Sequence, residues 1–243
     1  MRAISSVFLI ALAVLSQAYA TEVEHDISNG LSTHGDQSYI SFGLNTQLRD
    51  YSTHILNVER LDDTRVSYKR SCERIKCEAS GLSKESWGLK DFPSNTSNNV
   101  FTAKFARKYS LNSEDSSASW SEINLKSYSK ISIQNNSSEV FIKQLQLGYN
   151  SKLTLSSGIY WVEDLNLSVY SKITSKGDGP VWIVTKNATN IGFLSSIKSK
   201  NNKSAIGLIG YDSINIHTGA KINGFVYSKK TVELDFNAKI RGA

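Results

Sequence analysis

The chain has 243 residues, of which 40 % are hydrophobic and 21 % charged, a composition that is ordinary for a folded protein and excludes a disordered one. Its net charge of +6 favours anionic partners only weakly. With 2 Pro and 1 Met, the sequence is typical of a long β-structure with polar turns.

Residues 1–20, MRAISSVFLIALAVLSQAYA, have the features of a secretory signal peptide. Arg2 precedes an apolar run that is too short to span a bilayer, and the run is followed by an A-x-A cleavage signal ending at Ala20. We expect cleavage after Ala20 and export to the periplasm, the outer surface or the medium. The mature chain should have no transmembrane segment, and export argues against nucleic acid as a partner.

Residues 21–117 are expected to form a β-rich region that flanks or caps the rest, because solenoid ends expose strand edges that need covering. This region contains both cysteines, Cys72 and Cys77. In an oxidising compartment a disulfide between them is the expected state. Zinc would need four ligands, whereas the closest histidine in sequence is His54, and C-x4-C is not the C-x2-C redox spacing.

From residue 118 to the C-terminus the chain repeats the pattern h-x-h-x-x-x-S-K-h, where h is apolar, with variation in the Ser-Lys pair. The alternation inside each copy indicates strands, and a repeat length of roughly 20–50 residues indicates a solenoid. We therefore expect an all-β fold, a parallel β-helix of about six coils, with the last apolar residue of each copy in one inward column. These anchors are Ile131, Leu153, Ile173, Ile197, Ile222 and Ile240.

A lysine precedes five of the six anchors and should face solvent, since neighbouring strand residues point to opposite faces. One interpretation is that the lysines keep the solenoid soluble and block sheet-to-sheet aggregation. The other is a polyanion-binding stripe for surface polysaccharide, lipopolysaccharide or an acidic pilin face. Ser196 interrupts the column, which consists of Lys130, Lys152, Lys172, Lys221 and Lys239.

Trp161 and Trp182 lie in a second set of strands and are spaced as neighbours in adjacent coils would be. They are either part of a packed aromatic stack or a platform for stacking sugars.

The chain stops soon after Ile240, so the last coil is expected to be uncovered. Three explanations for an uncovered last coil are open. The chain is a shortened relative of a longer protein, it associates end to end with itself, or the last coil frays.

The sequence offers no catalytic, metal-binding or cofactor-binding residues. Glu163 and Asp164 are adjacent on a strand and point to opposite faces, while Asp178 is in a turn between glycines. No pair of aspartates recurs at the coil period, as a polysaccharide lyase or hydrolase would need. The 4 histidines are scattered without triad spacing.

Three stretches resemble a known family: GLSTHGDQSYISFGLNTQLRD at residues 30–50, SCERIKCEASG at 71–81, and LQLGYNSKLTLSSGIYWVEDLNL with GPVWIVT at 145–185. They are similar to the N-terminal region of the MSHA (mannose-sensitive haemagglutinin) pilus biogenesis family MshQ of Gram-negative bacteria. The resemblance implies an exported protein of a pilus or adhesion system and carries over no catalytic residue. We therefore expect a non-enzymatic structural or adhesive module; the alternative is an extracellular carbohydrate-active β-helix enzyme.

Overall fold

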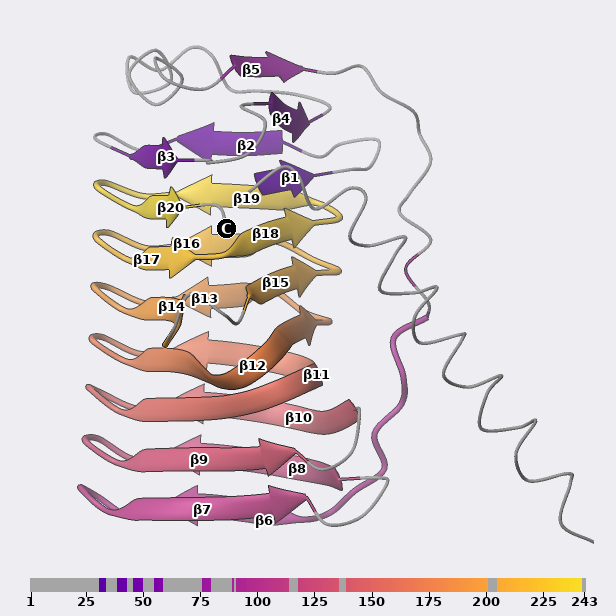
Figure 1. Cartoon of the computed structure of the whole chain (residues 1–243), viewed down its shortest axis with the longest axis vertical. Helices are drawn as coiled ribbons and strands as arrows, with labels where there is room; N and C mark the ends of the chain where they lie inside the picture. The colour runs from indigo at the N-terminus through magenta and orange to yellow at the C-terminus, as the bar shows by residue number, and fades with distance from the viewer. Residues whose placement is uncertain are drawn as a thin grey trace, which may run out of the picture.

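The computed structural model describes residues 31–33, 39–42, 46–49, 55–58, 76–79, 89, 91–113, 118–135, 139–200 and 205–241. Every regular element among them is a β-strand, and parallel strands stack into a solenoid of about six turns over residues 100–241 (Figure 1). The all-β, parallel β-helix expected from the repeat is confirmed.

In chain order, the strands among these residues are β1 (Leu31–Thr33), β2 (Tyr39–Phe42), β3 (Gln47–Arg49), β4 (Ile55–Val58), β5 (Lys76–Ala79), β6 (Val100–Ala103), β7 (Lys108–Ser113), β8 (Ala118–Leu125), β9 (Lys130–Asn135), β10 (Glu139–Leu147), β11 (Lys152–Leu167), β12 (Lys172–Thr185), β13 (Thr189–Ile191), β14 (Ser196–Ser199), β15 (Ile206–Gly210), β16 (Ile214–Ile216), β17 (Lys221–Asn223), β18 (Phe225–Ser228), β19 (Thr231–Leu234) and β20 (Lys239–Arg241).

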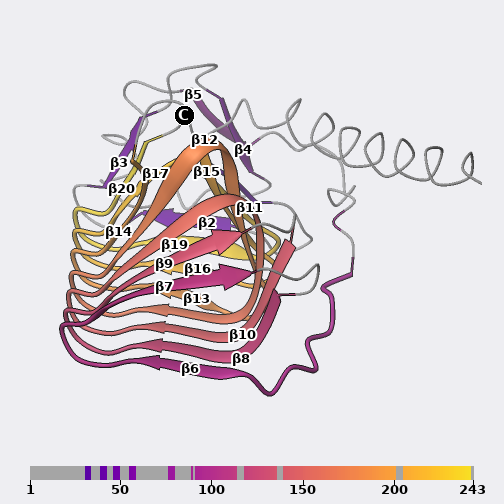
Figure 2. The ribbon, with the colours of Figure 1, turned by 60° about the horizontal axis from the view of Figure 1, so that its bottom comes forward.

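Each coil has three sides, and the strands on one side pair in parallel from coil to coil (Figure 2). The entry face leads into a tight turn and contains β6, β13, β16, β19, β2 and the last residues of β8, β10 and β11. The exit face leaves that turn and contains β7, β9, β14, β17, β20, β3 and the first residues of β11 and β12. The third face contains β15, β18, β1 and the remaining parts of β8, β10, β11 and β12.

The inward column of anchors is confirmed by the register. Ile131 pairs with Leu153, Leu153 with Ile173, and the same alignment continues through each coil to Ile240. All six anchors are at most 2 % exposed. Burying a side chain of this size contributes about 1.5–3 kcal/mol, so the stacked columns hold coils that could not bury their own faces alone.

The last coil is covered by the beginning of the chain, so the expectation that it would be uncovered is wrong. Strand β1 pairs with β18, β2 with β19 and β3 with β20, all in parallel and in coil order. Ile40 of β2 is fully buried and joins the same core. The first strands of the chain thus continue the solenoid above its last coil, where β4 and β5 follow (Figure 1).

The other end of the stack begins at Val100 and therefore includes residues ahead of the expected boundary at 118. Strands β6 and β7 pair with β8 and β9, which makes them a further coil with the same shape. Phe101 and Tyr109 pack against the core, with ring centroids 5.2 Å apart in an edge-to-face contact. These two large rings help to close the end of the stack.

Residues 91–99 run along the side of the stack toward β6 (Figure 1). Phe92 packs edge-on against Trp161 and Tyr211, at 5.4 and 5.6 Å between ring centroids. Further along, Asn95 Nδ2 donates a hydrogen bond to the carbonyl oxygen of Trp120. This segment, which we call the strap, therefore covers part of the third face.

Two expectations fall outside the described residues. The signal peptide at 1–20 is one, and the disulfide is the other, because Cys72 and the side chain of Cys77 are not described. In the described part of the chain, no helix has the length and apolar character needed to cross a membrane.

Candidate functional site

The corner between the entry and exit faces is built from one turn repeated in every coil. In the turn of residues 126–129, the amide and the hydroxyl of Ser129 both donate to the carbonyl oxygen of Lys126, at 3.1 and 2.6 Å. The third residue of each turn has a positive φ, near 60° at Tyr128, as a type II turn requires. The serine of the S-K motif therefore closes the turn from inside, and its lysine is the first residue to point outward.

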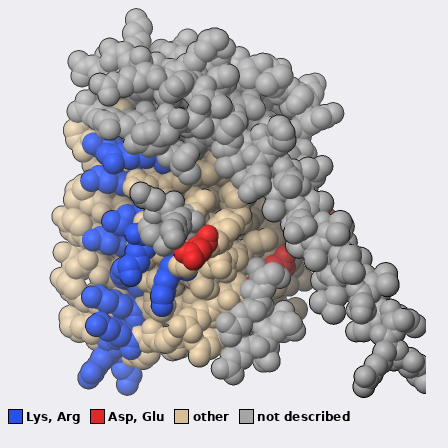
Figure 3. All heavy atoms as spheres, viewed as in Figure 1, with Lys and Arg blue, Asp and Glu red and all other residues tan. Residues whose placement is uncertain are grey.

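The structure brings the predicted lysines together in one column on the exit face. Lys130 pairs with Lys152, and Lys152 with Lys172; Ser196 then occupies the column before Lys221 and Lys239. Because parallel neighbours lie about 4.8 Å apart, the ammonium groups can approach one another closely. Figure 3 shows this lysine column along one side of the stack.

The column is longer and broader than the sequence analysis indicated. Lys108 extends it by one coil, since it pairs with Lys130. Lys198 and Lys200 lie on the same face, and together with Lys130 and Lys172 they help to lower the pKa of Lys152. Partial burial of Lys152 is the largest cause of that lowering, and the four like charges add to it. The site is therefore a concentrated region of positive charge.

The entry face has a different character. Its middle outward column is mostly amides in register, and the Asn215 side chain donates to that of Asn190 at 3.1 Å. The column consists of Asn124, Gln146, Asn166, Asn190 and Asn215, followed by Glu233. The entry face therefore carries mostly amides in register where the exit face carries lysines.

A row of exposed aromatic rings runs along the corner beside the lysine column, and the sequence analysis missed it. The rings contact one another in sequence along the stack, edge to face, with centroids 5.4–6.2 Å apart. Each ring is between 40 % and 64 % exposed. We call this row the aromatic ladder; it consists of Phe105, Tyr128, Tyr149, Tyr170 and Phe193.

The ladder alternates between the two central positions of the turn. Tyr128 and Tyr170 have the positive φ, whereas Phe105, Tyr149 and Phe193 come just before the residue that has it. The turns are also joined from coil to coil: the amide of Tyr128 donates to the carbonyl oxygen of Tyr149 at 2.9 Å, and that of Tyr170 to Phe193 at 3.0 Å. A side-chain hydrogen bond with Tyr128 raises the pKa of Tyr149. The ladder is therefore held on a continuous hydrogen-bonded backbone.

The two tryptophans lie in an apolar cluster on the outside of the third face. Trp161 pairs with Val184, and Trp182 with Ile159, so the two rings are offset by two residues rather than stacked in one column. Phe92 of the strap packs on Trp161, and Trp182 lies over Gly207, where a Cβ would clash with its ring. Both indoles are half-buried in contacts made by the chain itself. This arrangement favours the interpretation as a packed aromatic stack.

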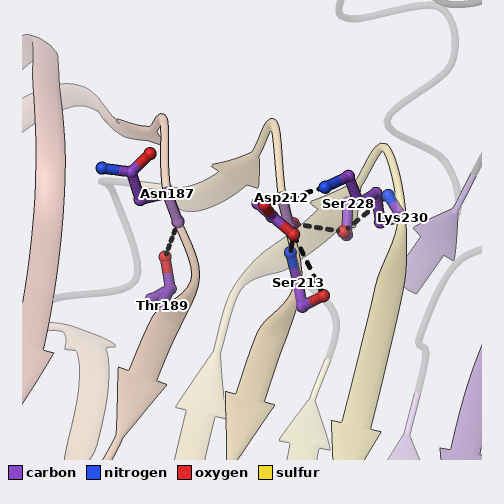
Figure 4. A network of polar contacts seen from close by, with 6 residues as sticks. All are labelled: Asn187, Thr189, Asp212, Ser213, Ser228 and Lys230. Atoms are coloured by element: carbon purple, nitrogen blue, oxygen red, sulfur yellow. Dashed lines mark hydrogen bonds and ion pairs between the residues drawn. The ribbon is translucent and has the colours of Figure 1, made fainter.

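The carboxylates near the corner between the third and entry faces contact cations and amides. Asp212 accepts from Lys230 Nζ at 2.9 Å and from the amide of Ser213 at 2.7 Å, while Ser228 Oγ donates to the Asp212 carbonyl oxygen (Figure 4). The hydrogen bond from Lys230 is the main cause that lowers the pKa of Asp212. This network connects successive coils, and in a neighbouring turn Thr189 Oγ1 donates to the Asn187 carbonyl oxygen. A structural role accounts for both.

Glu163 and Asp164 both lie half-buried outside the core, so the expectation that they point to opposite faces is wrong. Glu163 lies 3.6 Å from Lys186, whereas Asp164 accepts from Asn187 at 2.8 Å. Asp235 contacts His217 at 2.9 Å at the end of the entry face. Among the described residues, no cluster of three or more His, Cys, Asp or Glu side chains could hold a metal ion.

Fold and surface together define a parallel β-solenoid. An aromatic ladder runs along the corner between its entry and exit faces, and a lysine column runs beside the ladder on the exit face. In comparisons with known proteins, no family model, no curated protein and no solved structure matches the chain.

Proposed function

We propose that this protein is an exported, non-enzymatic structural or adhesive module of a cell surface, and that it holds an anionic surface polymer through the lysine column. The observation that carries the proposal is the in-register alignment of the column over successive coils. Like charges placed so close together repel by a few tenths to 1 kcal/mol a pair, and this cost is offset when a polyanion lies along them. An acidic polysaccharide and an acidic pilin face both fit this chemistry.

The resemblance to the MshQ family adds a type IV, MSHA-like pilus as the system in which the module works. The signal-peptide pattern of residues 1–20 supports export, and a rigid stack with repeated surface groups suits an adhesive or structural part. The column also keeps the exit face soluble, and this second role is compatible with the first.

The test is retention of the purified mature protein on immobilised polygalacturonate at low and high salt. We expect the protein to be retained at low salt and released at high salt, because salt screens the attraction between the lysines and the carboxylates of the polymer. A variant with glutamine at Lys130, Lys152, Lys172, Lys221 and Lys239 should lose most of this retention. A control with Lys186→Gln and Lys230→Gln removes two lysines that belong to ion pairs elsewhere and should be retained normally.

The same material distinguishes the enzymatic alternative. Incubation with the polysaccharide should release neither reducing nor unsaturated ends. Release of such ends by the wild type would contradict the proposal. A Glu233→Gln, Asp235→Asn variant would then test one pair of exposed carboxylates, in β19 and in the turn after it.

A further inference from the structure

We propose that the aromatic ladder is a binding ridge for a linear acidic polysaccharide, whose apolar sugar faces pack on the rings while its carboxylates lie along the lysine column. This inference rests on the proposed function, because it names the class of polymer that the lysines hold. It concerns different residues, and can therefore fail while the proposed function stands.

The rings of the ladder lie in solvent, which is unfavourable for apolar surface. Five aromatic side chains in contact, each at least 40 % exposed, form a continuous apolar ridge rather than scattered single residues. Contiguous apolar surface of this kind marks an interaction site more often than isolated exposed residues do.

Two residues of the ladder have an unusual backbone conformation. Tyr128 and Tyr170 have φ values of 60° and 59°, a region that bulky L-residues rarely adopt. The same turn position is taken in other coils by Ala106, Asn150, Leu194, Gly219 and Asn237, so the turn itself does not need a ring. A strained residue that the fold does not require points to a role in function.

The ladder has the shape of a narrow ridge. Its rings lie in single file along the stack, and their backbone position repeats every second coil, a distance of about 10 Å for parallel strands. Such a ridge matches an extended chain whose sugar units face alternately to one side and the other. It is one ring wide, which suits a linear polymer.

The surroundings of the ladder are positively charged. A lysine follows two or three residues after each ring of the ladder from Phe105 to Tyr170, and Lys104 and Lys126 lie on the other side of the first two rings. Positive charge on both sides opposes pairing of two copies of this corner and favours an anionic ligand. Successive rings already pack on one another, so a nucleic-acid base cannot intercalate between them, and a sugar polymer is favoured over a single-stranded nucleic acid.

The test uses substitutions that the chain itself contains at the same turn positions. The ladder variant has Tyr128→Asn and Tyr170→Asn, as at Asn150 and Asn237, with Tyr149→Ser, as at Ser127. The matched control is Phe236→Ser, because Phe236 is 49 % exposed in an equivalent turn but is separated from the ladder by the coil of Thr218. A third variant with phenylalanine at all three tyrosines keeps the rings and should bind as the wild type does, which separates the role of the rings from that of the hydroxyls.

Affinity electrophoresis would measure binding to polygalacturonate, to poly-L-glutamate, which has carboxylates but no sugar, and to single-stranded oligothymidylate. We expect the ladder variant to bind polygalacturonate about tenfold more weakly, with its binding to poly-L-glutamate unchanged. Equal loss on polygalacturonate and poly-L-glutamate, no loss on either, or a larger loss on oligothymidylate would each overturn the inference. If the lysine variant loses binding to both polyanions while the ladder variant keeps binding to both, the proposed function stands and the role of the ladder is rejected.

Discussion

Ile240, in the last strand of the chain, is the parallel neighbour of Leu48, which lies in a strand near its beginning. The pairing makes the first and last repeats one continuous stack and covers the strand edge of the last coil. The strap then carries the chain along the side of the stack toward its first coil at β6. Folding of the last coil is therefore coupled to residues at the opposite end of the sequence.

The first prediction concerns this cap. Ile40→Asp places a charge at a fully buried position of β2, which pairs with β19. We expect a loss of several kcal/mol of unfolding free energy at the cap, since an unpaired buried charge is costly. Uncovered strands should then associate, so light scattering should show oligomers. Ser41→Lys, one residue on, half-buried and paired with Glu233, should remain monomeric; equal association of both variants would contradict the capping role.

The second prediction tests the register in the middle of the stack. Leu153 is fully buried between Ile131 and Ile173 in neighbouring coils. Leu153→Asp should abolish cooperative unfolding, because the charge cannot leave the core without breaking the column. Thr154→Asp, at a half-buried outward position that loses a 3.2 Å hydroxyl contact to the buried Thr174, should cost no more than about 1 kcal/mol. Circular dichroism during urea unfolding distinguishes them, and similar curves for the two variants would reject the register.

The inward column was predictable because each copy repeats Ile or Leu at fixed offsets, and the physical need to bury those residues is the same in each coil. Two further copies were missed. The copy that runs from Ile40 to Leu48 has the same spacing, but Thr-Gln stands in place of Ser-Lys. The copy that runs from Phe101 to Tyr109 has an aromatic residue as its anchor. Terminal repeats differ from internal ones because they face different neighbours.

The order of the coils could not be predicted from sequence. A parallel edge offers the same backbone groups to any incoming strand, so nothing local tells β2 to pair with β19 rather than with β6. The aromatic ladder was missed for another reason. Its rings shift between two adjacent turn positions, so an alignment on Ile131 and its equivalents places Tyr128 and Tyr149 in different columns. Only the paired turns show that they are neighbours.

The third prediction is a loss of stability at alkaline pH. Burial is the main cause that raises the pKa of Tyr160 from 10.0 to about 12, although its hydroxyl donates to the Ser156 carbonyl oxygen at 2.9 Å. The folded state therefore holds the proton more tightly than the unfolded state. This stability is complete below pH 10 and is lost as the pH rises through 12, in total about 3 kcal/mol.

Burial also raises the pKa of Tyr227, which acts in the same direction. Tyr160→Phe should lower the unfolding free energy near neutral pH by about 1 kcal/mol, through the lost hydrogen bond, and reduce the alkaline slope. Urea unfolding at a series of pH values measures both. If the slope between pH 10 and 12 were the same in the variant, Tyr160 would not be the titrating group.

The fourth prediction is that salt stabilises the protein through the lysine column. Lys152 lies between Lys130 and Lys172, so removing its charge relieves two repulsions at once. In low salt, Lys152→Gln should raise the unfolding free energy by a few tenths to about 1 kcal/mol per relieved pair. Increasing the salt from about 0.01 M to 1 M shortens the screening length from about 30 Å to about 3 Å, and should stabilise the wild type more than the variant.

Lys186→Gln is the matched control, because Lys186 lies 3.6 Å from Glu163 and over the Phe92 ring on the third face. Its loss should be neutral or slightly destabilising in low salt, the opposite sign to Lys152→Gln. Thermal unfolding of the three proteins at several salt concentrations measures the difference. A Lys152→Gln variant that was less stable than the wild type in low salt would mean that the column is not repulsive in the free protein. The strain that a bound polyanion is proposed to relieve would then be absent.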